Sequence, residues 1–402
     1  MHTSKPLIAL LGHFPECDLA KWNFEFDAES AADLIAIGAF STVEGAFLRA
    51  FAKYLPFQFH FFSFSKFVAS TQRRRISENL QVTVIPPVPF SGMVSGWKLR
   101  SKLIRKLVCE HECDAVVGFR NIEGYGRMAI ESGLPATVVI EETVHGIPCP
   151  FRFALSFGVA RRVERRVVRR ARHMVVISEH LRKRMLAFGA RCQIENIPNI
   201  VGDRFFEIER NNPSYLLYVG RIAEEKGLLD LLEALRILSD RGERPQLKVV
   251  GGAMGTESVA HLQKCEIFCS RYLAKDQVEF LGSLRSDEVA ALHASCLALV
   301  MPSFAKYEGM GLVIAEAMAA GTPVIAYNFG PIPEFVTDQQ DGLLVEARCT
   351  DHLATAIERV ATDENWLQSA SRHARQRGHR YLGSAVASAY GEVINGLLKN
   401  RK

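Results

Sequence analysis

The sequence predicts an α/β protein of two doubly wound domains, each a mostly parallel sheet with helices on both faces. Three observations predict this fold. The chain has 402 residues, beyond the ~250–300 at which a single hydrophobic core stops growing. Short apolar runs alternate with amphipathic helical patterns, and most runs are continuous, as strands buried on both faces require. A segment rich in proline, asparagine and charge, residues 197–213, separates two sets of runs.

Each half of the chain contains six expected strands. In the first half they are Leu7–Leu11, Phe57–Phe64, Val82–Ile85, Ala115–Phe119, Ala136–Ile140 and Met174–Ile177. In the second half they are Tyr215–Val219, Leu247–Val250, Val278–Leu281, Leu299–Met301, Val324–Tyr327 and Leu343–Val345. Leucines spaced i, i+3, i+4 and i+7 from Leu228 predict a helix between the first two strands of the second set. We therefore expect domains over residues 1–200 and 201–382.

Composition narrows the class of protein. Apolar residues make up 48% and charged residues 23%, which is ordinary for a globular protein and excludes a disordered or collagen-like chain. The apolar runs all fall short of the ~20 residues that a membrane-spanning helix needs. Nine cysteines without a Cys-x-x-Cys pair predict reduced thiols and a cytoplasmic location. A hydride-transferring dehydrogenase is disfavoured because no Gly-x-Gly-x-x-Gly follows the first strand.

Basic residues are concentrated in the first half. Residues 1–200 hold 27 Lys and Arg against 18 Asp and Glu, a balance of +9, whereas residues 201–402 hold 22 against 26, a balance of −4. Two basic amphipathic helices, 98–108 and 160–172, carry much of the excess. They are either two solvated helix faces or a surface that adsorbs to an anionic membrane leaflet. No nucleic-acid-binding module accompanies the charge, so a nucleic-acid partner is not expected.

The sharpest motif spans residues 302–323. Gly321 and Pro323 end a helix that begins near Gly311, and this helix is apolar on every face except at Glu316. A carboxylate in such a helix is costly to desolvate unless something hydrogen-bonds it. Glu308 lies eight residues earlier, in a glycine-rich turn. The backbone N–H groups of residues 309–312 (Gly309, Met310, Gly311 and Leu312) form a positive helix N-terminus suited to phosphate.

Two further loops follow strands of the second set. Arg221 and Lys226 lie in one strand-to-helix loop, where a guanidinium fork and an ammonium group can clamp a diphosphate. Gly251 and Gly252 end the next strand and allow close backbone approach to a ligand. Each loop alone is weak evidence, because a glycine after a strand is usually only a turn. Their order along the chain makes the combination much stronger.

In this order of motifs the sequence resembles the retaining GT-B glycosyltransferases of glycosyltransferase family 4, also called glycosyl transferases group 1. The pair Glu308-x7-Glu316 resembles that family's glutamate motif, and residues 220–227 resemble its donor-phosphate loop. Gly251-Gly252, residues 280–282 and Gly330-x3-Glu334 fall in the family's order. Residues 177–179 and 197–199 resemble the end of its N-terminal domain and the hinge. The resemblance covers essentially the whole chain and is strongest from about 173 to 345.

The resemblance implies a GT-B architecture, in which two Rossmann-like domains face a central cleft. Residues 1–200 would bind the acceptor, residues 201–382 the nucleotide-sugar donor, and a C-terminal helix, 383–402, would pack back on the first domain. Arg221 and Lys226 would hold the diphosphate, Glu308 the donor sugar and Glu316 the ribose hydroxyls. His145 would hydrogen-bond near the reacting carbon. The implied donor site further includes the residues Gly251, Gly252, Leu281, Gly309, Met310, Gly311 and Leu312.

On the acceptor side the sequence departs from the family's pattern. Two glycines usually follow the first strand closely, whereas here about 25 residues, 12–40, separate that strand from the segment beginning Ser41-Thr42. Gly12, His13, Ser41 and Thr42 are the candidate acceptor-side residues. The inserted segment, with its aromatic residues, is either an unusual acceptor pocket or a plain surface loop.

The expected activity is retaining transfer of a hexose from a UDP- or GDP-sugar to a glycan or lipid-linked acceptor, in cell-envelope polysaccharide or glycolipid synthesis. The sequence contains no Asp-x-Asp, the motif with which many glycosyltransferases hold a divalent ion. We therefore expect neither a metal nor another cofactor, and expect Arg221, Lys226 and the helix N-terminus to neutralise the leaving diphosphate. The alternatives are a nucleotide-sugar epimerase of the same fold and a catalytically silent nucleotide-sugar-binding partner.

Overall fold

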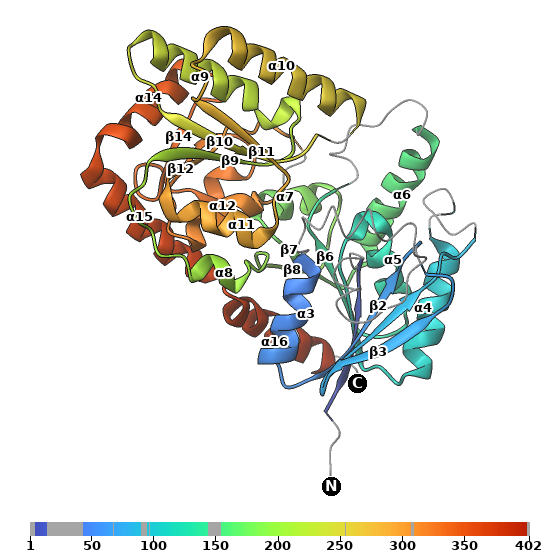
Figure 1. Cartoon of the computed structure of the whole chain (residues 1–402). Helices are drawn as coiled ribbons and strands as arrows, with labels where there is room; N and C mark the ends of the chain where they lie inside the picture. The colour runs from blue at the N-terminus through green and yellow to red at the C-terminus, as the bar shows by residue number, and fades with distance from the viewer. Residues whose placement is uncertain are drawn as a thin grey trace. The chain divides into compact units, whose positions relative to one another are not determined.

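The computed structural model describes residues 5–13, 43–66, 68–89, 95, 97–143, 154–253, 255–306 and 309–399. The chain forms two compact units (Figure 1). Unit 1 comprises Met1–Ile200 and Gly383–Lys402, and unit 2 comprises Val201–Leu382. Each unit is built on one sheet, so the prediction of two Rossmann-like α/β domains is confirmed.

The sheet of unit 1 has eight strands in the order β3-β4-β2-β1-β5-β6-β7-β8. All neighbours are parallel except β3 and β4, which form an antiparallel pair. Continuous burial of β1, β2 and β5 to β7 on both faces explains their near-continuous apolar sequences. The strands are β1 Leu7–Leu11, β2 Gln58–Phe64, β3 Gln72–Ser77, β4 Leu80–Ile85, β5 Ala115–Gly118, β6 Ala136–Ile140, β7 His173–Val176 and β8 Gln193–Asn196.

Helices cover both faces of this sheet. On one face α3 (Val43–Tyr54) and α16 (Gly383–Lys399) pack against each other, and Figure 1 shows them side by side although they come from opposite ends of the chain. Their contact joins an aromatic cluster in which Tyr390 lies about 5 Å from Phe47 and Phe51, at 5.2 and 5.1 Å between ring centroids. The other helices among the described residues of unit 1 are α4 Lys98–Glu110, η2 Asn121–Glu123, α5 Tyr125–Glu131, α6 Ala154–Arg170 and α7 Glu179–Ala187.

The sheet of unit 2 has six strands in the order β11-β10-β9-β12-β13-β14. Every recorded pairing is parallel. All six correspond to strands expected from the apolar runs. They are β9 Tyr215–Val219, β10 Gln246–Val250, β11 Val278–Gly282, β12 Cys296–Met301, β13 Val324–Tyr327 and β14 Gly342–Val345.

Two layers of helices enclose the second sheet. The predicted leucine-rich helix is α9, and it packs against α10 and α14 on one face. On the other face α12 packs against α15 and α8. The helices of unit 2 are α8 Asp203–Phe206, η5 Glu224–Lys226, α9 Leu228–Asp240, α10 Thr256–Tyr272, α11 Ser286–Leu292, η6 His293–Ser295, α12 Leu312–Ala319, α13 Ile332–Phe335, α14 Thr350–Thr362, α15 Glu364–Gly378 and η7 His379–Tyr381.

Two strands of unit 1 were not expected, β3 and β8. Both lie at the edges of the sheet, where one side of the backbone meets solvent. The sequence of β3, Gln-Arg-Arg-Arg-Ile-Ser, alternates between exposed and half-buried positions, and β8 is mostly polar. Basic side chains on an edge strand discourage pairing with another chain. A search for apolar runs therefore misses both.

The two basic helices differ in how they bury their apolar residues. In α6 the stripe that contains Val163 and Val167 is packed into unit 1. Arg161 is half-buried, and the other five arginines of the helix are exposed. In α4 the buried positions are Ser101, Ile104 and Val108. Leu99 of α4, in contrast, is 43% exposed. Among the residues described, no helix combines the length and the apolar character that crossing a bilayer demands.

Candidate functional site

The strand order of unit 2 determines where a ligand binds. Counted from β9, the order is 3-2-1-4-5-6, so the chain reverses its direction of winding between β9 and β12. In open α/β sheets ligands bind outside the carboxyl ends of the strands at such a switch point. The loop after β9 contains Arg221 and Lys226, and the segment after β12 leads to α12. The topology therefore places the two predicted phosphate-binding loops next to each other.

The loop after β9 is fixed by backbone contacts to the loop after β10. The N–H of Gly220 donates to the carbonyl of Val250 at 3.0 Å, and that of Ile222 donates to Gly252 at 3.1 Å. Gly251 has a φ of +152°, and a Cβ there would lie 1.8 Å from the carbonyl oxygen of Gly220. Only glycine fits between these two loops.

The loop after β9 is also joined to the segment after β12. Gly227 has a φ of +74°, and a Cβ there would lie 2.0 Å from the carbonyl oxygen of Pro302. The N–H of Phe304 donates to the carbonyl of Glu225 at 2.9 Å, and the hydroxyl of Ser303 donates to the same carbonyl at 3.4 Å. The segment that carries Lys226 is thereby held against the chain that enters α12.

The amino end of α12 points free backbone donors out of the helix. No side chain caps the helix at Gly311. Within the described chain, the N–H groups of Gly309, Met310 and Gly311 donate to no backbone carbonyl. Helix N-termini of this kind are sites for anions because unpaired N–H groups and the helix dipole act together.

Glu316 lies in the middle of α12 and is only partly exposed. Burial raises the pKa of its carboxyl group to about 8, and Arg204 of α8 opposes part of that shift. No hydrogen bond to this carboxyl group is recorded within the described residues. A ligand hydroxyl group could supply the missing donor, which is the role that the motif predicted. Arg204 was not predicted, because only the fold brings α8 close to α12.

The remaining predicted donor residues are distributed as follows. Leu281 lies in β11 and is half-buried, and Met310 is 6% exposed. Arg221 is exposed, and its carbonyl accepts a hydrogen bond from the hydroxyl of Tyr218 at 3.2 Å. Glu308 lies outside the described residues. The candidate donor site of unit 2 thus gathers every described member of the predicted set except Leu281 around the loops after β9, β10 and β12.

Unit 1 has its own switch point, between β1 and β5. Gly12 and His13 follow β1, and His13 Nδ1 lies 3.8 Å from Glu123 Oε2 in the turn after β5. The other predicted residues on this side, His145, Ser41 and Thr42, lie outside the described residues, as does the inserted segment from residue 14 onward. The predicted acceptor side is therefore represented by Gly12 and His13.

Two buried polar side chains at this edge were not predicted. Asn121, after β5, is 4% exposed, and Thr143, after β6, is 2% exposed. Among the described residues, the amide Nδ2 and Oδ1 of Asn121 and the hydroxyl of Thr143 have no hydrogen-bond partner. A buried polar group without a partner costs ~1–3 kcal/mol. These groups are therefore buried at a cost that contacts among the described residues do not offset, and no sequence motif identifies them.

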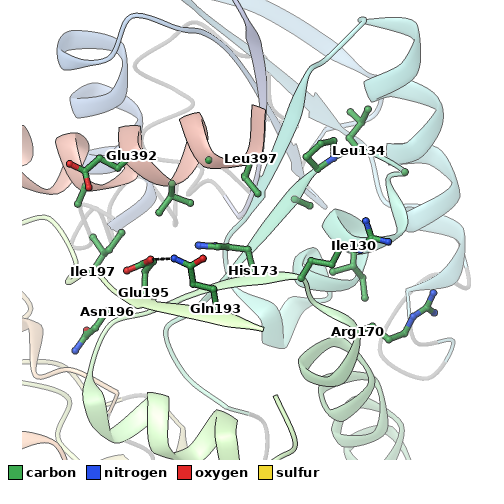
Figure 2. A pocket seen from close by; sticks show the side chains of 17 residues that line it. Ile130, Leu134, Arg170, His173, Gln193, Glu195, Asn196, Ile197, Glu392 and Leu397 are labelled. Atoms are coloured by element: carbon green, nitrogen blue, oxygen red, sulfur yellow. Dashed lines mark hydrogen bonds between the residues drawn. The ribbon is translucent and has the colours of Figure 1, made fainter. Parts of the chain in front are cut away.

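A cavity of about 1230 Å³ lies in unit 1 at the opposite edge of the sheet, between α16 and the amino ends of β6 to β8 (Figure 2). Basic and acidic side chains both line the cavity. Arg170 and Arg172 precede β7, Glu195 is in β8 and Glu392 is in α16. Burial lowers the pKa of His173 in its wall. Because sheet ligands bind at carboxyl ends, this cavity is separate from both switch points.

The two doubly wound α/β units match solved structures of the GT-B fold. The structure is similar to sucrose-phosphate synthase from Thermosynechococcus elongatus, with a TM-score of 0.75 and 18% identity over 98% of this chain and 100% of that one. It is also similar to Anabaena HepE in complex with UDP and glucose, with a TM-score of 0.70 and 18% identity over 96% and 99% of the two chains. At these identities the likeness concerns the fold.

Sequence comparison points to one family. Residues 202–377, nearly all of unit 2, match the family described as "Glycosyl transferases group 1". A GDP-mannose-dependent alpha-(1-6)-phosphatidylinositol monomannoside mannosyltransferase of Mycobacterium tuberculosis is 29% identical over 296 residues, which cover 69% of this chain and 74% of the relative. The resemblance predicted from the motifs is confirmed, and the protein is a nucleotide-sugar glycosyltransferase.

Proposed function

We propose that the protein catalyses retaining, metal-independent transfer of a hexose from a UDP- or GDP-sugar to a hydroxyl group of a glycan or lipid-linked acceptor. One observation carries the proposal. Backbone contacts at the switch point of unit 2 hold the loop with Arg221 and Lys226 beside the amino end of α12. Two cations and a helix N-terminus at one sheet edge are suited to a diphosphate.

The proposed mechanism follows from the charge that develops. Breaking the glycosyl–phosphate bond leaves negative charge on the diphosphate and positive charge on the sugar ring. Arg221 and Lys226 neutralise the diphosphate together with the N–H groups at the start of α12. Removing one such preorganised group costs ~3–4 kcal/mol of barrier. By resemblance to the family, Glu308 contacts the donor sugar and His145 hydrogen-bonds near the reacting carbon.

The relatives supply the substrate classes. The mycobacterial relative is named for GDP-mannose and a phosphatidylinositol mannoside, and the structurally similar HepE was solved with UDP and glucose. Both donors are nucleoside diphosphate hexoses. The acceptor in the mycobacterial relative's name is a sugar on a lipid. We therefore propose a polyhydroxylated acceptor, a glycan or a sugar on a lipid carrier.

A transfer assay tests this proposal. UDP-glucose, UDP-galactose and GDP-mannose are each incubated with the protein and with oligosaccharide or lipid-linked acceptors, in the presence and absence of EDTA. We expect a glycosylated product whose anomeric configuration matches the donor, at a rate that EDTA does not change when the donor is saturating. Transfer that requires Mg²⁺ or Mn²⁺ contradicts metal independence. Interconversion of the nucleotide sugar without acceptor indicates the epimerase, and binding without turnover indicates the silent partner.

We further propose that α4 and α6 bring unit 1 to an anionic membrane surface. Five of the six arginines of α6 are exposed, and Leu99 of α4 is exposed between Lys98 and Lys102. Each basic residue near an anionic surface contributes ~1 kcal/mol. Flotation with vesicles containing phosphatidylglycerol should recover the protein at low salt and less of it at 0.5 M salt. Absence of binding at both salt concentrations contradicts this proposal.

A further inference from the structure

Three side chains with metal-ligating atoms meet where unit 2 leaves β14 and enters α14. They are Glu346, Cys349 and His352, and their ligand atoms all lie within 4.8 Å of one another. Nδ1 of His352 is 3.6 Å from Oε2 of Glu346. None of the three belongs to the predicted donor site.

The backbone brings these side chains together. The N–H of Cys349 donates to the carbonyl of Glu346 at 3.2 Å, closing a turn in which Arg348 has a left-handed φ of +63°. Cys349 is the N-cap residue of α14, and its side chain makes no capping hydrogen bond. His352 lies three residues later, in the first turn of the helix, where an i, i+3 pair shares one face. The fold therefore preorganises all three groups.

We propose that Glu346, Cys349 and His352 bind a zinc ion. Sulfur, imidazole nitrogen and carboxylate oxygen are the ligands of Zn²⁺, at ~2.0–2.3 Å, whereas Mg²⁺ takes oxygen ligands. Tetrahedral ligands at those distances lie ~3.3–3.8 Å apart. The side chains of Glu346 and His352 are 72% and 58% exposed, so they can rotate by the small amount that is required. Water completes the coordination.

The site is coupled to the donor loops through Arg348. Its guanidinium group lies 4.7 Å from the ring centroid of Phe304, in the segment after β12. The N–H of Phe304 donates to the carbonyl of Glu225, the residue before Lys226. An ion that fixes the turn around Arg348 therefore also restrains the segment against which the phosphate-binding loop packs. Zinc at this site acts on donor affinity rather than on the chemical step, an effect that rests on the proposed function.

Metal titration tests the site directly. Co²⁺, added to the full-length protein, reports a bound thiolate through its sulfur-to-metal charge-transfer absorption, and Zn²⁺ binding is measured by calorimetry. We expect one ion per chain, and a loss of affinity of at least ~10-fold in Cys349→Ser and in His352→Ala. Cys192→Ser and His373→Ala, a half-buried cysteine in unit 1 and an exposed histidine on α15, are the matched controls and should retain wild-type affinity.

Thermal unfolding gives a second readout. Zn²⁺ at 100 times its Kd should raise the Tm of the wild type by ~5 °C, and should leave that of Cys349→Ser unchanged. Absence of the Co²⁺–thiolate absorption, or an equal loss of affinity in the controls, overturns the site. These readouts do not depend on glycosyl transfer. Zinc binding by a protein that does not transfer sugar refutes only the proposed function. EDTA-resistant sugar transfer by a protein that does not bind zinc refutes only this site. A donor KM unchanged by zinc in a transferring enzyme refutes the coupling.

Discussion

The ligand-binding edges of the two units are constructed differently. In unit 2 the loops after β9, β10 and β12 are joined by backbone hydrogen bonds. At positions 227 and 251 a carbonyl oxygen of the neighbouring loop lies where any residue other than glycine would place its Cβ. In unit 1 the corresponding edge carries Asn121 and Thr143, buried without partners. The contacts between the loops of the first edge form without a ligand, whereas the second edge contains buried polar groups whose hydrogen bonds are not made among the described residues.

This difference has a chemical reason. Every donor of such an enzyme presents the same diphosphate, so one rigid arrangement of cations and N–H groups can serve it. Acceptors differ in the number and position of their hydroxyl groups, and an edge with unpaired polar groups is specific for a ligand that pairs them. The family match follows the same division, because it covers residues 202–377 of unit 2.

The largest expected effect is the loss of activity when a cationic side chain of the donor site is removed. Lys226→Ala removes a charge that the proposal assigns to the leaving diphosphate, and kcat should fall by ~10²–10³. Steady-state rates with saturating donor measure this fall, and circular dichroism should show an unchanged fold. Lys264→Ala, which removes an exposed lysine from α10, is the control. A wild-type kcat in Lys226→Ala would remove this residue from the site.

The next largest effect is a loss of stability when the contact between the loops after β9 and β10 is disturbed. Gly251→Ala places a Cβ against the carbonyl of Gly220 at a φ that alanine rarely adopts, so unit 2 should lose ~2–4 kcal/mol of stability. Gly242→Ala is the control, since that glycine also has a positive φ, +91°, with open space around it; its cost should be ~1–2 kcal/mol. Urea unfolding compares the two. Equal costs would mean that the loops are not in close contact.

Glu316 should make the stability of unit 2 dependent on pH. Because burial raises its pKa to about 8, the folded state retains a proton that the unfolded state releases near pH 4.5. Stability should therefore fall as pH rises from about 4.5 to 8 and level off above that range. Glu316→Gln should remove this part of the slope and also weaken UDP or GDP binding. Urea midpoints and calorimetry at pH 5, 7 and 9 measure both, and a wild-type slope in the variant contradicts the assignment.

The smallest expected effect belongs to the acceptor edge. Asn121→Leu replaces an unpartnered buried amide by an apolar group of similar size, so unit 1 should gain up to ~1 kcal/mol. Acceptor KM should rise several-fold while donor KM stays constant. Ser101→Ala is the control, because it removes another buried, unpartnered hydroxyl group, in α4, and should leave both KM values unchanged. An unaltered acceptor KM in Asn121→Leu would limit this amide to a structural role.

What the sequence determined is local. Continuous apolar runs specify strands buried on both faces, and all twelve predicted strands overlap observed ones over most of their length. The order of glycines, cations and glutamates specifies the donor loops, because a short strand-to-helix loop fixes the neighbours of its own residues. The edge strands β3 and β8 escaped prediction since half-exposed strands need no apolar run.

The tertiary structure alone decided how distant segments meet. The resemblance predicted only that the C-terminal helix packs on the first domain. Its pairing with α3 and the approach of Arg204 to Glu316 depend on packing between segments far apart in the chain. The unpaired state of Asn121 and the approach of Glu346 to His352 are likewise properties of backbone turns in a folded domain. Burial and long-range contact set the energies of these groups, and a linear sequence records neither.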